Sequence, residues 1–176
     1  MKRIFGIAIL ATLMACSQSD RKSTEQTDTS HQDSTALSND ISIKDDKKEV
    51  IFNQYLALKD ALVLSDEKAA QAAAGDLQKS LASYEGCEPT AEIALKIAGT
   101  ANIADQRKNF TTLSADLIAL MKNTELANGT IYVQHCPMAN KGDGGDWLSK
   151  EKDIKNPYYG DEMLACGRVA EELKAN

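Results

Sequence analysis

The sequence predicts an all-α domain: an antiparallel bundle of four to five helices, with a short β segment before a C-terminal loop and helix that contain Cys and Met. Apolar residues recur every three or four positions through four successive stretches, as on the buried face of a helix. Short connections with turn-forming residues separate these stretches, which is typical of neighbouring antiparallel helices. One short stretch, 130–134, has the β-branched and aromatic residues that favour a strand.

Residues 1–16 have the features of a bacterial lipoprotein signal peptide. Lys2 and Arg3 precede an apolar run that closes with Leu13-Met14-Ala15-Cys16, which resembles a lipobox. The run is shorter than the ~20 residues that span a bilayer, so a cleaved signal is favoured. In that family of signals the cysteine is lipidated, which makes Cys16 the predicted lipid attachment site. The expected location is therefore the bacterial cell envelope, anchored to a membrane. A secreted protein with a chance cysteine is the alternative.

The segment 17–48 is predicted to be a flexible tether. It is rich in Ser, Thr, Asp, Gln and Lys and has no aromatic residue, so it cannot bury enough apolar surface to offset the cost of ordering. The formal net charge of the chain is −6, and loss of the signal's two cations leaves −8. A surface of this sign argues against a nucleic-acid partner, because phosphate contacts need Lys and Arg.

The remaining residues, 49–176, form the predicted domain, and its helices are expected in the following order. The first starts at Glu49, and the second follows the N-cap signal Ser65-Asp66-Glu67. Pro89 is expected in the first turn of the third helix, and the fourth starts near Asp105. The apolar stripes expected in the first and fourth helices are Ile51, Tyr55, Leu58 and Leu62, and Phe110, Leu113, Leu117 and Leu120.

The C-terminal part is predicted to be a strand, a loop and a last helix. The strand covers Thr130 to Gln134, a loop covers Asn140 to Asp146, and Asn156-Pro157 forms a turn. The last helix is expected from Asp161 to Leu173, with Met163, Cys166, Val169 and Leu173 along one stripe.

This C-terminal part concentrates side chains that bind soft metal ions. The candidate ligands are His135, Cys136, Met138, Met163 and Cys166. On the predicted last helix Met163 and Cys166 are three residues apart, which puts their Cβ atoms ~5–6 Å apart on one face. Thiolate and thioether ligands select Cu(I) over hard ions such as Mg²⁺. The types of ligand are therefore those of a site for copper as Cu(I), although the spacing alone favours a disulfide.

A second interpretation of the same residues remains open. Cysteines outside the cytoplasm usually form disulfides, so Cys136 and Cys166 could pin the strand to the last helix. Met163 in an apolar stripe is then core packing. With Cys16 lipidated, three cysteines remain, so at least one of them is free, binds metal or pairs with another chain.

Several motifs resemble an uncharacterised bacterial envelope domain. They are Gln106-Arg107 with Phe110, Leu113-Ser114 and Leu117, then C-P-M-A at 136–139, G-x-x-W-L-S at 144–149, and N-P-Y-Y-G-x-x-M-L-x-C-G at 156–167. The resemblance spans about Glu49 to Leu173. That domain occurs alone in lipoproteins and fused to periplasmic adaptor subunits of copper and silver efflux pumps. Cys-Pro-Met is also similar to the heavy-metal motif Y-x-C-P-M-H, although Ala139 stands in place of its last His.

Two hypotheses follow. In the first, a membrane-anchored envelope protein binds Cu(I), or Ag(I), for buffering or for delivery to an efflux adaptor protein. In the second, a helical interaction module is locked by a Cys136–Cys166 disulfide and binds no metal. An enzyme is not expected, because the chain has no G-x-S-x-G, H-E-x-x-H or phosphate-loop motif and only one His near the cysteines.

Overall fold

The computed structural model describes residues 40–175. The predicted signal peptide 1–16, the lipid attachment site Cys16 and most of the predicted tether lie outside the described residues. Within residues 40–175, no helix combines the length and apolar character needed to cross a membrane.

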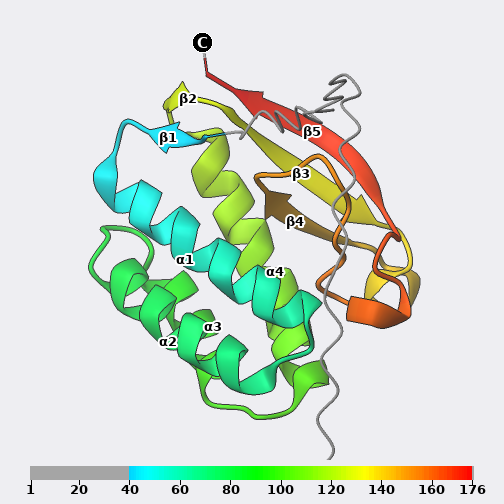
Figure 1. Cartoon of the computed structure of the whole chain (residues 1–176). Helices are drawn as coiled ribbons and strands as arrows, with labels where there is room; N and C mark the ends of the chain where they lie inside the picture. The colour runs from blue at the N-terminus through cyan, green and yellow to red at the C-terminus, as the bar shows by residue number, and fades with distance from the viewer. Residues whose placement is uncertain (1–39, 176) are drawn as a thin grey trace, which may run out of the picture. The chain divides into compact units, whose positions relative to one another are not determined.

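Four helices form one layer of the domain, in the order that the periodicity predicts. They are α1 (Asp46–Val63), α2 (Glu67–Ala82), α3 (Glu88–Ala98) and α4 (Ile103–Lys122). Successive helices pack against one another, and α1 and α4 lie next to the strands while α2 and α3 lie on the far side (Figure 1). The predicted stripes are buried except for Leu120, which is partly exposed, and Leu58 and Phe110 are fully shielded from solvent.

Side-chain caps fix where the helices begin. Asp45 precedes α1, and its carboxylate accepts hydrogen bonds from the backbone amides of Lys47 and Lys48. Asp66 caps α2 in the same way, through the amide of Ala69. These bonds satisfy amide groups that have no partner inside the helix. The first helix therefore starts at Asp46, three residues before the predicted position.

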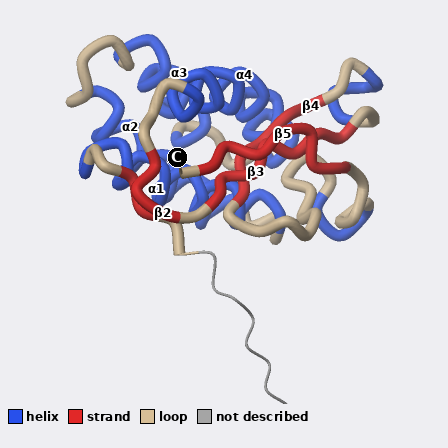
Figure 2. Tube along the Cα trace, turned by 90° about the horizontal axis from the view of Figure 1, so that it is seen from above, coloured by secondary structure: helices blue, strands red, loops and turns tan. Residues whose placement is uncertain are grey.

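The prediction of an all-α fold is wrong, because the domain is a mixed α and β structure with two antiparallel sheets. The larger sheet has the order β4-β3-β5, formed by β3 (Thr130–Cys136), β4 (Gly145–Ser149) and β5 (Arg168–Lys174). These strands run side by side next to the helices (Figure 2). A small sheet pairs β1 (Ser42–Ile43) with β2 (Leu126–Asn128), so ordered structure reaches into the predicted tether.

The predicted last helix, Asp161 to Leu173, does not form. A short 3-10 turn, η2 (Gly160–Glu162), is followed by irregular chain and then by β5, which pairs with β3 from Thr130↔Lys174 to His135↔Arg168. The break is at Gly167, whose φ of +145° is not helical. A side chain there would meet the carbonyl oxygen of His135 at 2.8 Å, so the close approach of two backbones requires glycine.

The predicted loop from Asn140 to Asp146 is also shorter than expected. A 3-10 segment, η1 (Ala139–Gly142), occupies its first part, and β4 starts at Gly145. Trp147 is therefore inside a strand, opposite Gln134 of β3, and is fully buried.

Buried polar and aromatic side chains join the helices to the sheet. The hydroxyl of Tyr55 on α1 lies 2.7 Å from that of Ser114 on α4 and accepts a hydrogen bond from the amide of Leu148 on β4. The ring of Tyr55 stacks on Phe110, with 5.4 Å between centroids. Burial raises the pKa of Tyr55 far above its ordinary value, so its hydroxyl stays protonated.

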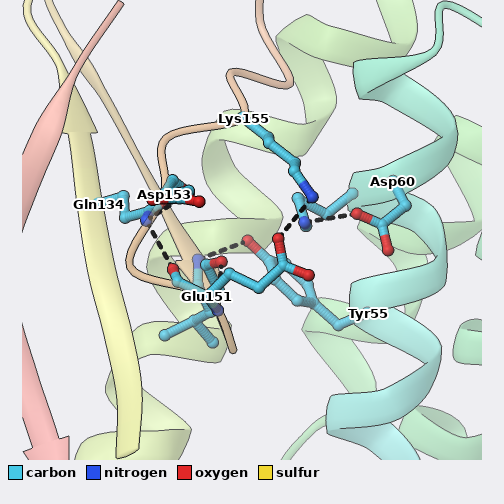
Figure 3. Close-up of polar contacts among 9 residues, drawn as sticks. Tyr55, Asp60, Gln134, Glu151, Asp153 and Lys155 are labelled. Carbon is cyan, nitrogen blue, oxygen red and sulfur yellow. Dashed lines mark hydrogen bonds and ion pairs between the residues drawn. The ribbon is translucent and has the colours of Figure 1, made fainter. Parts of the chain in front are cut away.

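The segment after β4 is held between β3 and α1 (Figure 3). The side-chain amide of Gln134 on β3 lies 2.9 to 3.2 Å from the carbonyl oxygens of Glu151, Lys152 and Asp153. On the side facing α1, Lys155 pairs with Glu151 at 2.5 Å. This anchoring determines where the chain enters the N-P-Y-Y-G motif.

Candidate functional site

The two C-terminal cysteines meet at the end of β3. The Sγ atoms of Cys136 and Cys166 are 3.1 Å apart, and both residues are free thiols. Cys136 is fully buried, whereas Cys166 is partly exposed. The third described cysteine, Cys87, precedes α3 in the helical layer. The structure thus brings together two of the predicted ligands, one shielded and one accessible.

Asn156 positions the segment that carries Cys166. It is fully buried, and its side-chain amide donates to the carbonyl oxygen of Cys166 at 2.9 Å. Its side-chain oxygen accepts from the amide of Tyr158 at 2.8 Å, and its backbone amide donates to the carbonyl of Leu164 at 2.9 Å. The side chain of Asn156 therefore links the two ends of the loop from 156 to 166. Because this loop has no regular secondary structure, its buried backbone groups need such side-chain partners for their hydrogen bonds.

The two tyrosines of the motif fix this loop to the chain after Cys136. The hydroxyl of Tyr158 donates to the carbonyl of Asp146 at 2.9 Å, and that of Tyr159 donates to the carbonyl of Met138 at 2.6 Å. Any side chain at Gly145 would collide with the ring of Tyr158 at 2.7 Å. The ring of Tyr158 and the start of β4 thus pack without space between them.

Arg107 on α4 fixes the same loop to the helices. Its Nε donates to the carbonyl of Pro157 at 2.8 Å, and its Nη2 donates to the carbonyl of Leu62 at 3.0 Å and the hydroxyl of Ser65 at 2.8 Å. Leu62 is in the last turn of α1, where carbonyl groups lack partners within the helix, so a cation is well placed there.

The part of the chain that resembles a known protein family is mainly the helical layer. Residues 51–129 match a family described as "Protein of unknown function (DUF3347)". The matched segment runs from α1 to the end of β2, less than half of the chain, and stops before β3. The cysteine pair therefore lies outside it. No similar curated protein and no similar solved structure was found.

His135 is not brought to the cysteine pair. Neighbouring residues of a strand point to opposite faces, so the side chains of His135 and Cys136 diverge. The Nδ1 atom of His135 lies 2.8 Å from a carboxylate oxygen of Asp146, its partner across the β3–β4 ladder. The ring also lies against Gly144, where a side chain would meet it at 2.9 Å.

The two methionines lie on either side of the pair along the chain. Met138 follows Cys136 by two residues and is 51% exposed. Met163 is partly buried, and its carbonyl oxygen accepts a hydrogen bond from the amide of Cys166 at 3.0 Å. The prediction that Met163 and Cys166 lie on one face of a helix is wrong, although this one hydrogen bond joins them in a single turn of the chain. Among residues 40–175, no cluster of three or more His, Cys, Asp or Glu side chains is arranged to hold a metal ion.

The thiol of Cys166 is protonated at neutral pH. Its hydrogen bond with Cys136 and, to a smaller degree, burial raise its pKa above the ordinary value. A metal ion binds the thiolate, so loading this pair must release protons, and binding must strengthen as the pH rises.

Sequence reasoning did not identify Asn156, Gln134 and Arg107 as the residues that hold the site. The sequence predicts only a turn at Asn156-Pro157, although an Asn before Pro inside an aromatic motif is a signal for a structured loop. Gln134 and Arg107 bind carbonyl groups from distant parts of the chain, so no local sequence pattern predicts these contacts.

Proposed function

We propose that this protein is an envelope protein, anchored to a membrane through a lipid on Cys16, that binds Cu(I) or Ag(I) with Cys136 and Cys166. It buffers the metal ion or delivers it to a heavy-metal efflux adaptor protein. The observation that carries the proposal is the 3.1 Å separation of the two sulfur atoms, contributed by segments that are 30 residues apart. Two thiolates and a neighbouring thioether form a ligand set that selects soft monovalent ions.

The accessibility of the pair supports exchange of the ion. Cys136 is buried and gives a sulfur ligand at a fixed position, whereas Cys166 is partly exposed on irregular chain. A metal ion with bonds to sulfur of ~2.3 Å needs its two sulfurs roughly 4 Å apart. The pair must therefore open by roughly 1 Å, and the side chain of Cys166, which is partly exposed, has more room for this shift than the buried side chain of Cys136. Met163, and the exposed Met138, are the candidates for a third ligand.

The test is an anaerobic Cu(I) titration against a competing chelator, with protein that begins at Ser17 and so lacks Cys16. We expect one ion per chain with the wild-type domain, and loss of this binding in both Cys136→Ser and Cys166→Ser. Cys87→Ser is the matched control, because it also removes one thiol but in the helical layer. His135→Ala should bind as the wild type does, since its ring pairs with Asp146.

Normal Cu(I) binding by both Cys136→Ser and Cys166→Ser would refute the proposal. Equal loss in Cys87→Ser would show that binding depends on thiol content rather than on the pair. A titration with Ag(I) under the same conditions shows which of the two ions the protein binds more tightly.

The second candidate function is a structural clasp, in which the two thiols lose two electrons and two protons to an oxidant of the envelope and form a disulfide. The complete burial of Cys136 and the contact between the sulfurs favour it, since closing from 3.1 Å to a bond of ~2.05 Å is also a shift of roughly 1 Å. Protein purified in air without reductant would then be 2 Da lighter by mass spectrometry than the reduced form, as expected for a disulfide. It would bind no Cu(I), and reduction would loosen the segment around Asn156.

A further inference from the structure

A groove beside the cysteine-bearing loops has no role in the metal proposal. It is about 560 Å³ in volume and lies between the start of α4, the η1 turn and the N-P-Y-Y-G motif. Its size is in the range of small-molecule sites, ~300–1,000 Å³. Five charged side chains and two tyrosines contribute to its wall: Asp105, Arg107, Lys108, Lys141, Tyr158, Tyr159 and Glu162.

The cations of the groove are not neutralised by contact. Within residues 40–175, neither Lys108 nor Lys141 makes an ion pair, and all hydrogen bonds of Arg107 go to neutral oxygens. Burial lowers the pKa of Arg107, and the carboxylates of Glu162 and Glu67 offset this effect only in part, so a further anion in the groove would also favour the charged guanidinium. The three cations and the two carboxylates of the groove (Asp105 and Glu162) give it a formal charge of +1, opposite in sign to the net charge of −6 of the chain.

The tyrosines provide an apolar surface with fixed geometry. The hydroxyls of Tyr158 and Tyr159 are already bound to carbonyl oxygens of Asp146 and Met138. The ring of Tyr158 is held against Phe110 and Trp147, with centroids 5.8 and 6.1 Å away. Tyr158 is only 7% exposed, so the surface offered to a ligand is mainly the ring of Tyr159, which Tyr158 supports from below the surface.

The backbone that carries Lys141 is strained and fixed. Asn140 and Lys141 have φ values of +54° and +64°, a conformation that residues other than glycine rarely adopt. The side chain of Asn140 holds it, because it accepts from Thr111 of α4 at 3.0 Å and donates to the carbonyl of Gly144 at 2.8 Å. Strain that the surroundings maintain in this way is typical of functional sites.

We infer that this groove binds a small organic anion, whose carboxylate or phosphate group meets Lys108, Lys141 and Arg107 and whose apolar body packs on the ring of Tyr159. Asp105 and Glu162 at the exposed rim limit the charge that the groove accepts, which favours a ligand with a single anionic group over a polyanion. The inference is independent of the metal proposal, since none of the cysteine or methionine side chains contributes to the groove.

The experiment is a two-dimensional NMR titration of the protein at low ionic strength with three probes of similar size: benzoate, phenyl phosphate and the neutral benzyl alcohol. We expect both anions to shift resonances of Lys108, Lys141 and Tyr159 and to bind at least 10-fold more tightly than benzyl alcohol. Salt should weaken the anions and leave the alcohol unchanged. Arg107 is kept, because it also anchors the loop.

The double variant Lys108→Ala/Lys141→Ala should weaken binding of benzoate and phenyl phosphate about 10-fold, or ~1.4 kcal/mol. The matched control is Lys68→Ala/Lys96→Ala, which removes the same charge from exposed positions on α2 and α3. Unchanged affinity in the first variant, equal weakening in the control, or equal binding of all three probes would each overturn the inference. If only phenyl phosphate or only benzoate responds, the anion class narrows to that group.

Discussion

The two layers of this domain are stabilised in different ways. The helices, α1 to α4, are held by apolar contacts that are spread over many buried side chains, such as Leu62, Leu77 and Leu117. The C-terminal part, from β3 to β5, contains long irregular stretches that are held by a few buried polar side chains, each bound to backbone groups. The candidate site lies in the C-terminal part, where a single buried side chain such as Asn156 positions the backbone that carries Cys166.

This difference has a thermodynamic consequence. Stabilisation by apolar contact is non-directional and roughly proportional to the buried area, so no single apolar side chain of a helix fixes the position of its neighbours. Hydrogen bonds to backbone groups are directional, and a buried group that loses its partner costs ~1–3 kcal/mol. Substitutions in the helices should therefore lower the stability of the whole domain, whereas substitutions in the C-terminal part should loosen it locally.

The largest effect is expected from Leu77→Ala in α2. Leu77 is fully buried, and removing such a side chain from a core typically lowers the free energy of unfolding by ~2–5 kcal/mol. Because the folded C-terminal part is untouched, the alkylation rate of Cys166 under native conditions should not change. Denaturant unfolding and thiol alkylation measure the two quantities. A variant that alkylates much faster in native buffer would show that the layers do not behave separately.

The next largest effect is expected from Asn156→Ala. It leaves the amide of Tyr158 and the carbonyl of Cys166 without their partner, which should cost about 1–3 kcal/mol, confined to the C-terminal part. Hydrogen exchange should accelerate in β5 and Cys166 should alkylate faster, while the amides of α2 and α3 keep their protection.

Asn109→Ala is the control for this substitution. Asn109 donates to the carbonyl of Asp105 on the exposed surface of α4, so its replacement should change stability by less than ~0.5 kcal/mol. If Asn156→Ala instead lowers protection uniformly across the helices, the loop is part of the global folding unit and the proposed division between the layers is wrong.

The sequence predicted the helical layer well because its signals are local. An apolar stripe such as Ile51, Tyr55, Leu58 and Leu62 requires only that the chain be a helix with one buried face. The cap signal at Asp66 and the first-turn position of Pro89 are also local, so they predict the order and the approximate boundaries of the helices.

Local sequence signals do not predict β5, because the contacts that make this segment a strand are with β3, far away in the sequence. Val169 and Leu173 are four residues apart and lie among Ala, Glu and Lys, a pattern that favours a helix in isolation. Pairing with β3 overrides that preference, and the only local sign of it is Gly167 within the expected helix. The proximity of Cys136 and Cys166 was expected under both hypotheses, but the residue that arranges it, Asn156, is recognisable only in three dimensions.

The smallest effect is expected from Lys155→Ala, which tests whether surface charge contributes to holding the C-terminal part. The Lys155–Glu151 pair is 2.5 Å long, but its side chains are 48% and 44% exposed, so solvent screening limits its contribution to less than ~1 kcal/mol. The matched pair in the helical layer is Lys79–Asp76, and Lys79→Ala should cost equally little.

The pH dependence of this pair distinguishes charge from packing. The hydrogen bond from Lys155 lowers the pKa of Glu151, so the stabilisation is present above the ordinary carboxyl pKa and is lost as the pH falls through the lowered value. Glu151 in turn raises the pKa of Lys155, so the stabilisation persists into the alkaline range and is lost only as the pH rises through that value. Unfolding of Lys155→Ala and the wild type should therefore differ at neutral pH and low salt, and coincide in acid or in 1 M salt. A difference that survives both conditions would mean that the stem of Lys155 packs against α1, so that apolar contact rather than charge accounts for its contribution.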